Sequence, residues 1–582
     1  MQDVVSELAD ERRRVLRLVG DAHIAYFSME VALASDLPTY AGGLGVLAGD
    51  VLRSAADLGL GMIGVTLVHR RGYFRQRLDA GGRQTTQPLT WAPEERLTAL
   101  EPRCAVDIDG RPVTVRAWRY HIRGVDGHIV PVLLLDTDLS QNDAEARRFT
   151  DVLYGGDDHY RLCQEAVLGI GGVRMLRALG YHDLRRFPLN EGHSALLALE
   201  LYAEALARTP HDPAGAAERV RRTCVFTTHT PVPAGHDQFP AALAEKVLGT
   251  EQIHALRALD CCSDRLNMTL VALRLSHWVN GVARSHGEVS SSMFPGYHIA
   301  SISNGVHSAT WTSPPFRRLY DRYIPDWQRS SFTLRYARSI PGPAVSGAHL
   351  EAKQLLIDAV NDRMGARFRS DMLTLGFARR ATAYKRPALI FHDPERLRKI
   401  AADAGGLQLV FAGKAHPRDE SGQALIRTVV EHGAALAPDV RLVWIPDYDL
   451  CLAQLITAGT DVWVSTPRPP EEASGTSGMK AAHNGVPSLS VRDGWWWEGH
   501  VEGVTGWAVG AAHRDRGTPR EDAEDAEALY CSLQHDVVPA WLDAIRWADI
   551  MRATIAINAS FFNTQRVLHE YVVRAYHNEA AP

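Results

Sequence analysis

Three segments of the chain combine small or basic residues in patterns that suit the binding of an anion. The first is PTYAGGLGVLAGD, in which Gly42, Gly43 and Gly45 follow a turn and open a helical pattern. Glycines at such a place let bare backbone N–H groups and a helix N-terminus approach an anion. The spacing matches neither the GxGxxG of dinucleotide sites nor the GK[ST] of a P-loop, so no nucleotide site is indicated. Taken alone, the turn is more typical of a structural role.

The second segment, GFARRATAYKRPALIF, concentrates positive charge directly after a predicted strand, MLTLGFA. It contains Arg379, Arg380, Lys385 and Arg386. Like charges repel, and open α/β sheets bind ligands at the carboxyl ends of their strands, so this group suits an anion. A solvated basic face is the alternative, and the apolar residues on both sides argue against it.

The third segment, EASGTSGMK, places a lysine one turn inside a predicted helix that begins in small residues. The run from 473 to 478 follows the predicted strand TDVWVST and exposes backbone N–H groups, and Met479 and Lys480 begin the helical pattern. A lysine there is either a ligand of a phosphate or an amine that forms a Schiff base. The residue chemistry alone leaves these two roles equally open.

Short apolar runs that alternate with helical patterns must position these segments. A chain of 582 residues exceeds the roughly 250 to 300 that one hydrophobic core supports, so two large domains are expected. The alternation occurs in two series, separated by an aromatic and proline-bearing stretch at residues 312–345, and it predicts parallel sheets covered by helices. The predicted strands are AHIAYFSM, GMIGVTLV, VPVLLLD, CVFTTHT and YHIASISNGV, then MLTLGFA, LQLVFAGK, VRLVWIP and TDVWVST.

The composition excludes several classes of function. Lys and Arg number 63 against 68 Asp and Glu, a net charge of -5 that offers no field for nucleic acid or an anionic membrane. The cysteines form no CxxC pair, and we assign no residue as a metal ligand. The N-terminus lacks an apolar signal core and no later run approaches the ~18 apolar residues of a membrane span, so a cytoplasmic location is expected.

Together, the segments resemble one known family. EASGTSGMK, GGLGVLAGD, ARRATAYKR, FTTHTPVPAGHDQF, LNEGHSAL and SNGVH are similar to motifs of the α-glucan (glycogen, starch, maltodextrin) phosphorylases, especially their shorter bacterial branch. The resemblance runs from about Tyr26 to Tyr571. It implies the α/β GT-B fold, in which two Rossmann-like domains face each other across a catalytic cleft. We expect the domains at 1–315 and 316–582, with the last helix packing back on the first domain.

The resemblance also implies a pyridoxal 5'-phosphate cofactor and assigns residues to it. Lys480 would form the Schiff base, and Tyr448 matches a position that packs beside the cofactor. The cofactor phosphate would rest on Gly475, Thr476 and Ser477, with Arg379 near it.

Further positions match those that hold the substrates. Arg380 and Lys385 would hold inorganic phosphate with the glycine turn of Gly42 and Gly43. The positions expected around the glucosyl unit are His229, counted with the catalytic residues, and Leu44, Asn304, Tyr384, Glu472, Ser474, Glu191 and His193. Outside the family context, a structural role is the more typical one for both: His229 would cap local backbone, and Asn304 before Gly305 would be a turn residue.

The implied reaction is reversible phosphorolysis of terminal α-1,4-linked glucosyl units of glycogen or maltodextrin, with retention, giving glucose 1-phosphate. Family members are usually homodimers, and the short N-terminal segment leads us to expect no phosphorylation or nucleotide control. Two alternatives stay open at this point: a sugar-nucleotide-dependent glycosyltransferase on the same fold, and a phosphorylase-like protein that uses a different acceptor or only binds glucan.

Overall fold

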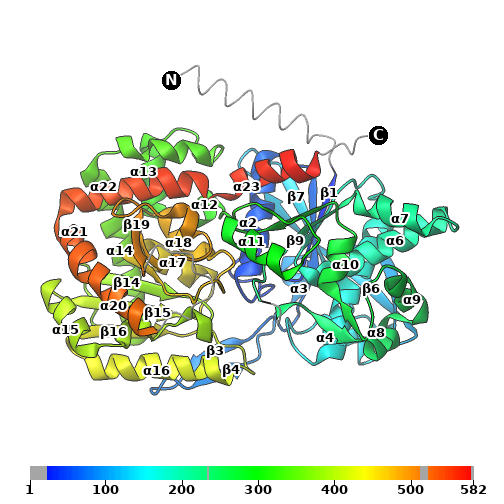
Figure 1. Ribbon diagram of the computed structural model, residues 1–582, viewed down its shortest axis with the longest axis horizontal. Coiled ribbons are helices and arrows are strands. Elements are labelled where there is room, and N and C mark those ends of the chain that lie inside the picture. The colour runs from blue at the N-terminus through cyan, green and yellow to red at the C-terminus, as the bar shows by residue number, and fades with distance from the viewer. Residues whose placement is uncertain (1–22, 233–234, 511–521, 578–582) are drawn as a thin grey trace.

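The computed structural model describes residues 23–232, 235–510 and 522–577. Two α/β lobes lie side by side, each built on its own sheet (Figure 1). We call the part that holds the sheet strands between residues 24 and 301 the N-terminal lobe, and the part with those between 373 and 509 the C-terminal lobe. Within the described ranges, no helix combines the length and the apolar character needed to cross a membrane.

The N-terminal lobe is organised around a nine-stranded sheet in the order β13-β12-β9-β8-β1-β2-β7-β6-β5. Neighbouring strands from β13 to β7 are parallel, whereas β5, β6 and β7 pair antiparallel at one edge. The strands are β1 (Ile24–Ser28), β2 (Met62–Leu67), β5 (Thr98–Ile108), β6 (Arg111–Arg123), β7 (Ile129–Asp136), β8 (Phe187–Asn190), β9 (Cys224–Thr227), β12 (Trp278–Gly281) and β13 (Ala300–Ser301).

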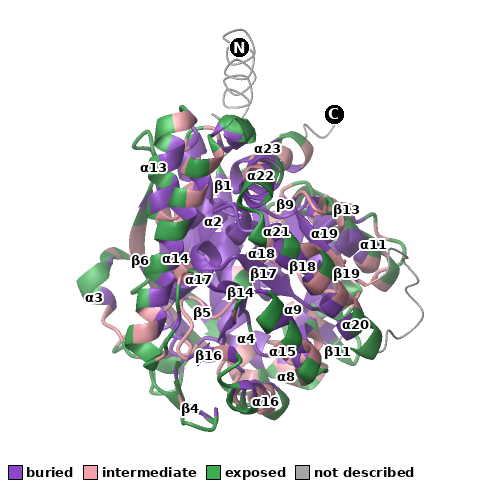
Figure 2. Ribbon diagram, turned by 90° about the vertical axis from the view of Figure 1, so that its left-hand side faces the viewer, coloured by how far each residue is buried: buried purple, intermediate pink, exposed green. Residues whose placement is uncertain are grey.

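Helices cover both faces of this sheet, and their apolar sides form two cores. One core joins the sheet to the helices between residues 158 and 274, and the other joins it to α2 (Gly43–Leu58), which is almost wholly buried (Figure 2). The other helices are α3 (Pro93–Arg96), α4 (Asp158–Ala166), α5 (Gly172–Ala178), α6 (Leu196–Arg208), α7 (Pro213–Arg221), α8 (Ala241–Leu248), α9 (Thr250–Ala258), α10 (Met268–Arg274) and α11 (Arg284–Met293).

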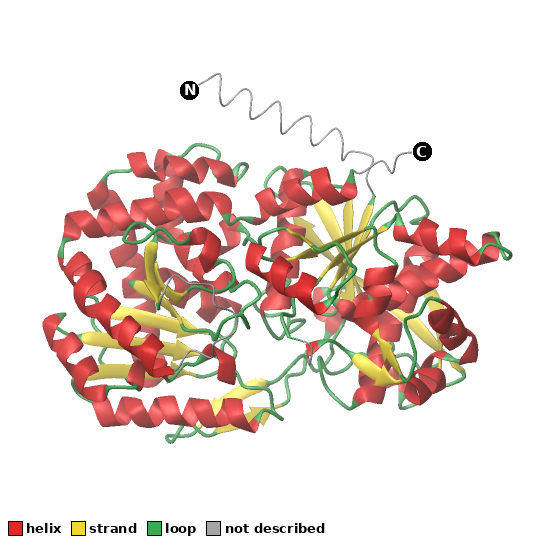
Figure 3. Ribbon diagram, in the orientation of Figure 1, coloured by secondary structure: helices red, strands yellow, loops and turns green. Residues whose placement is uncertain are grey.

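The C-terminal lobe contains a six-stranded, fully parallel sheet in the order β16-β15-β14-β17-β18-β19 (Figure 3). Its strands are β14 (Leu373–Ala378), β15 (Leu407–Ala412), β16 (Val440–Ile445), β17 (Val462–Ser465), β18 (Ser488–Val491) and β19 (Gly506–Val509). The helices of this half of the chain are α12 (Ser308–Trp311), α13 (Pro314–Tyr323), α14 (Gly342–Met364), α15 (Pro394–Asp403), α16 (Glu420–Leu436), α17 (Leu450–Gly459), α18 (Thr476–Ala482), α19 (Trp496–Gly499), α20 (Asp522–Ser532), α21 (Val538–Leu542) and α22 (Ala544–Thr554).

Two elements connect the lobes at places far from each other in the sequence. The hairpin of β3 (Arg75–Leu78) and β4 (Gln84–Gln87) reaches the C-terminal lobe, where the Gln76 side-chain amide donates to the Gly413 carbonyl at 3.0 Å. Helix α23 (Thr564–Tyr571), near the chain end, packs against α2 of the N-terminal lobe. The relative position of the lobes is therefore held from both sides.

The α/β fold class predicted from the sequence, a GT-B-like pair of parallel-sheet units, is confirmed. The antiparallel pairing of β5 and β6 is a departure from the expected strand–helix alternation. Strand β5 mostly alternates exposed with half-buried residues, and β6 alternates half-buried with buried residues over part of its length, because this edge of the sheet is only partly covered.

Candidate functional site

The basic segment lies at the carboxyl end of β14, where two of its cations converge on one buried carboxylate. Arg379 Nη1 lies 3.2 Å from Glu472 Oε2, and Lys385 Nζ forms an ion pair with the same oxygen. Arg379 also donates to the Ser465 hydroxyl at 2.8 Å. Arg386 differs from the expectation, because it turns away and binds Asp525 Oδ2 at 2.6 Å.

Burial perturbs the charges of this group. It lowers the pKa of Lys385 to about 8, and the neighbouring Arg379 contributes in the same direction. Burial alone would raise the pKa of Glu472, but Lys385 and Arg379 lower it below its ordinary value. The carboxylate is thus ionised between two cations. Lys385 and Arg379 would also attract a bound anion, which would pair with them beside the Glu472 carboxylate or in its place. Oppositely charged groups favour each other's ionised forms.

Arg380 points toward the glycine turn of the other lobe. A Cβ added at Gly42 would lie 2.8 Å from Arg380 Nη2, so a larger residue would displace the guanidinium from this position. Arg380 is exposed and forms no hydrogen bond or ion pair with the described residues. At Gly43, the first residue of α2, a Cβ would meet no atom within 4 Å. The Arg380 guanidinium of one lobe therefore lies near the open start of α2 in the other lobe.

Lys480 lies in the second turn of α18 with its amine buried. Its Nζ lies 4.1 Å from the centre of the Trp311 ring, and burial lowers the pKa of the amine to about 8. The Trp311 indole in turn donates to Asp50 Oδ2 at 2.7 Å on α2. Lys480 Nζ donates no hydrogen bond to any of the described residues. A buried amine with a lowered pKa is suited to act as a nucleophile.

The loop before α18 fits a phosphate-bearing cofactor attached to this lysine. Gly475 has φ 84°, a left-handed backbone that favours glycine, and a Cβ there would lie 3.4 Å from Arg379 Nη2. Arg379 Nη2 lies 3.4 Å from the Ser477 hydroxyl, and its Nε is buried without a partner in the described part of the chain. Backbone N–H groups from Thr476 onward begin the helix. Donors of this kind, beside a reactive amine, suit pyridoxal phosphate.

A second cluster joins the expected His229, Glu191 and His193 in the N-terminal lobe. The Glu191 carboxylate accepts from the His229 backbone N–H at 2.7 Å, and His229 Nε2 lies 2.7 Å from Asn190 Oδ1. Burial lowers the pKa of His229 to about 4, so its imidazole is neutral. Burial alone would raise the pKa of Glu191, but nearby imidazoles, His229 first, lower it below its ordinary value. Neutral imidazole and ionised carboxylate suit hydrogen bonding to sugar hydroxyls.

The remaining expected residues lie around these groups. Ser474 is buried, and its hydroxyl has no partner among the described residues. Asn304 is buried too, with its backbone held by Val282 O at 3.0 Å. Tyr384 lies beside Lys385, whose Nζ is 4.5 Å from its ring centre. Tyr448 packs against the apolar cluster that contains Met479, the residue before Lys480. Leu44 follows Gly43 in the first turn of α2.

Three residues that connect these groups were missed in the sequence. Glu30 follows β1, and its Oε2 accepts from the Gly42 N–H at 3.0 Å. Its Oε1 accepts from the Tyr154 hydroxyl at 3.0 Å, and the Tyr154 ring lies 5.9 Å from that of His193. Asp493 follows β18 and accepts from the Glu472 N–H at 2.8 Å. Glu30 and Asp493 each come shortly after a strand, at the sheet edge where side chains meet, but a lone acid there does not show which group it will bind. Tyr154 follows no strand, and its sequence position carries no such signal.

Comparison with known proteins agrees with this arrangement. The model of the carbohydrate phosphorylase family matches residues 237–498. A maltodextrin phosphorylase of Thermococcus litoralis is 37% identical over 95% of this chain and 70% of its own length. A glycogen phosphorylase of Mycobacterium tuberculosis is 36% identical over 95% of this chain and 70% of its own. A glycogen phosphorylase of Aquifex aeolicus is 34% identical over 95% of this chain and 86% of its own length.

The matches to these relatives cover 95% of this chain. The resemblance seen in the sequence motifs is thus confirmed by full-length similarity. The chain belongs to the carbohydrate phosphorylase family of enzymes.

Proposed function

We propose that this protein is an α-glucan phosphorylase that transfers terminal α-1,4-linked glucosyl units of glycogen or maltodextrin to inorganic phosphate. The proposal depends on one observation. Arg379 and Lys385 meet Glu472 at the end of β14, and Arg380 reaches the glycine turn of the other lobe. This arrangement of basic groups beside an open helix start suits an anionic co-substrate. The similarity to maltodextrin and glycogen phosphorylases supports a glucan as the other substrate.

In this proposal Arg380 and Lys385 hold the substrate phosphate. Lys385 is buried and loses little freedom on binding, whereas Arg380 supplies a guanidinium that no described residue occupies. The backbone N–H of Gly43 would add a donor from the start of α2. Fixed cations in a site of low polarity stabilise developing charge without further reorganisation, so they act mainly on the transition state.

The residues that would hold pyridoxal phosphate are Lys480, through its amine, and the loop 475–477 with Arg379. When bound, this cofactor supplies a second phosphate group that can exchange a proton with the substrate phosphate. Phosphorylases generally use this cofactor. Tyr448 would pack beside it, since it contacts the same apolar cluster as Met479.

The sugar would be positioned by polar groups of both lobes. His229, neutral at physiological pH, and the ionised Glu472 present an acceptor or donor to hydroxyl groups. The unpartnered hydroxyl of Ser474 adds another. Asn304, Tyr384, Leu44, Glu191 and His193 are proposed to complete the surroundings of the glucosyl unit.

The proposed reaction breaks the bond between the anomeric carbon and the glycosidic oxygen and forms one between that carbon and a phosphate oxygen. A proton moves from the substrate phosphate to the leaving oxygen, which ends as a hydroxyl of the shortened glucan. Because the phosphate stays on one face of the sugar, configuration is retained, and no pair of carboxylates about 5 Å apart is needed. Arg380 and Lys385 position the phosphate for both events.

We further propose that residues 1–315 and 316–582 are the two domains, and that the protein acts as a homodimer. The sheets of the two lobes fall on either side of this boundary.

The test of the function is a direct assay. Purified protein is incubated with maltodextrin and inorganic phosphate, and glucose 1-phosphate is measured. We expect release of glucose 1-phosphate that requires both substrates, and the reverse reaction with glucose 1-phosphate as donor. Transfer from UDP-glucose or ADP-glucose without phosphorolysis would contradict the proposal and favour a sugar-nucleotide-dependent glycosyltransferase. Phosphorolysis of a different acceptor alone would overturn the glucan assignment.

A further inference from the structure

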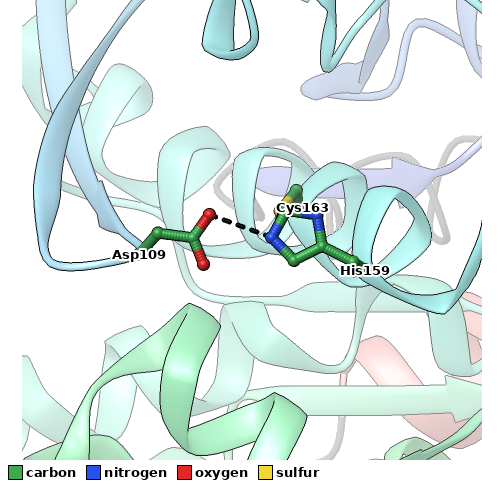
Figure 4. Close-up of side chains that lie close together, drawn as sticks. All are labelled: Asp109, His159 and Cys163. Carbon is green, nitrogen blue, oxygen red and sulfur yellow. Dashed lines mark hydrogen bonds and ion pairs between the residues drawn. The ribbon is translucent and has the colours of Figure 1, made fainter.

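A cluster of metal-ligand side chains lies in the N-terminal lobe outside the site described above. Asp109, His159 and Cys163 each offer one ligand atom, and these atoms lie within 4.8 Å of one another (Figure 4). His159 Nε2 is 2.9 Å from Asp109 Oδ2 and 3.8 Å from Cys163 Sγ. From this geometry we propose that the cluster binds a divalent zinc ion.

Two separate elements create the cluster. Asp109 occupies the turn between β5 and β6 with φ 54°, a left-handed backbone that aspartate tolerates, and its N–H is held by the Val247 carbonyl at 3.2 Å. His159 and Cys163 lie four residues apart on α4, so they share one face of that helix. The N-cap of α4 is Asp157, whose side chain accepts from Tyr160 N–H at 3.0 Å. Both supports hold the backbone from which the three side chains extend.

The distances match a tetrahedral zinc centre. With bonds of about 2.0 Å to nitrogen and oxygen and about 2.3 Å to sulfur, tetrahedral angles give N–O and N–S separations of about 3.3 and about 3.5 Å. His159 Nε2 lies 2.9 Å from Asp109 Oδ2 and 3.8 Å from Cys163 Sγ. These separations differ from the tetrahedral values by about 0.4 and about 0.3 Å. Small side-chain movements would bring the three atoms onto one ion, and a water molecule would take the fourth position.

An ordinary hydrogen bond between Asp109 and His159 explains the cluster less completely. Asp109 Oδ1 is buried and has no partner among the described residues, an arrangement that costs free energy unless a ligand compensates it. Cys163 is fully buried with its sulfur toward these polar groups instead of toward the apolar core alone. A carboxylate, a thiolate and a neutral imidazole also balance the charge of one divalent ion, which suits a buried position.

The ligand types select zinc over the other common divalent cations. Thiolate and imidazole favour zinc, whereas magnesium and calcium prefer oxygen ligands. Burial, and then the nearby Asp109 charge, raise the pKa of the Cys163 thiol above its ordinary range, so the free thiol is protonated. Binding would displace that proton as the zinc–sulfur bond forms.

The ion would fasten the tip of the β5–β6 hairpin to α4. This helix also carries Arg161, whose Nη2 lies 2.9 Å from Asp237 Oδ2, and Asp237 lies 3.2 Å from His193 Nε2. The proposed role is therefore structural: it holds the edge of the sheet and the helix behind the second cluster. It does not depend on the proposed phosphorolysis, and its readouts are metal content and thermal stability.

The experiment uses the full chain, stripped with a chelator and titrated with Zn²⁺ or Co²⁺. We expect one equivalent to bind with a thiolate-to-cobalt charge-transfer band, and Zn²⁺ at one hundred times its Kd to raise Tm by about 2 °C. His159→Gln keeps a polar side chain beside Asp109 but removes the imidazole, and Cys163→Ala removes the thiolate. Each should lower the affinity for Zn²⁺ by at least about 100-fold.

A cysteine outside the cluster provides the matched control. Cys531→Ser, on α20 of the other lobe, should keep the equivalent of metal, the charge-transfer band and the rise in Tm. Cys163→Ala opens a small space in the core and could unfold the protein for that reason. In that case the His159→Gln variant decides the outcome, because His159 is partly exposed. Binding of less than one equivalent, a cobalt spectrum without the thiolate band, or unchanged affinity in His159→Gln would overturn the proposal.

Discussion

Arg380→Ala separates phosphate binding from folding more cleanly than any other substitution in the site. Arg380 is exposed, forms no hydrogen bond or ion pair with the described residues and approaches Gly42 of the other lobe. One hydrogen bond to a charged group contributes about 1.5–3 kcal/mol, which corresponds to about 10- to 150-fold in an equilibrium or rate constant. The free energy of unfolding should change by no more than about 0.5 kcal/mol, as for other exposed side chains.

The assay measures kcat/KM for phosphate at saturating maltodextrin, binding of maltodextrin without phosphate, and the midpoint of chemical unfolding. We expect Arg380→Ala to reduce kcat/KM for phosphate by about 10- to 150-fold, with glucan binding within twofold of the wild type. Arg363→Ala, at an exposed arginine near the end of α14, is the matched control and should change none of the three. An equal loss for phosphate and glucan, or unfolding at clearly lower denaturant, would mean that Arg380 has a structural role.

Two further predictions concern the buried charges beside Arg380. Lys385 has its pKa lowered to about 8, so it is protonated below that pH and loses its charge above it; KM for phosphate should rise as pH increases past 8. Lys385→Arg, whose guanidinium stays protonated, should flatten that rise, and an identical profile in the variant would contradict the assignment. Glu472→Gln leaves Lys385 and Arg379 buried without their counter-charge and should lower the free energy of unfolding by about 3 kcal/mol, with phosphate recovering part of the loss. Chemical denaturation with and without phosphate measures this loss of stability, and Glu471→Gln is the matched control. Equal free energies of unfolding for Glu472→Gln and the wild type would refute the prediction.

Strands with continuous apolar sequences could be predicted, whereas short or half-exposed ones could not. The run LQLVFAGK contains β15, which is buried at every position, and MLTLGFA contains β14 in the same way. In contrast, β5 is exposed or half-buried over most of a length that includes Pro102, and β8 has four residues including Pro188. Neither was among the predicted strands, because their pairing depends on neighbours far away in the sequence.

The candidate site could be predicted where a motif held its residues together. Lys480 and the loop before it lie on one short segment, so the sequence alone indicated an anion site beside a lysine. The contact of Arg380 with Gly42 joins positions on different lobes, and only the folded chain shows that they meet. Glu30 was missed for the same reason, since a lone glutamate after a strand carries no sign that it will accept from the glycine turn.

The central claim is that Lys480 carries pyridoxal phosphate beside a phosphate-binding site. Its most direct test is reduction of the purified protein with borohydride, which makes the linkage between cofactor and amine permanent, followed by peptide mass spectrometry. The account predicts one pyridoxyl-phosphate group, on Lys480, and predicts that Lys480→Ala loses the bound cofactor and the phosphorolytic activity together. A modified lysine elsewhere, or Lys480→Ala that retains the full cofactor and activity, would contradict it.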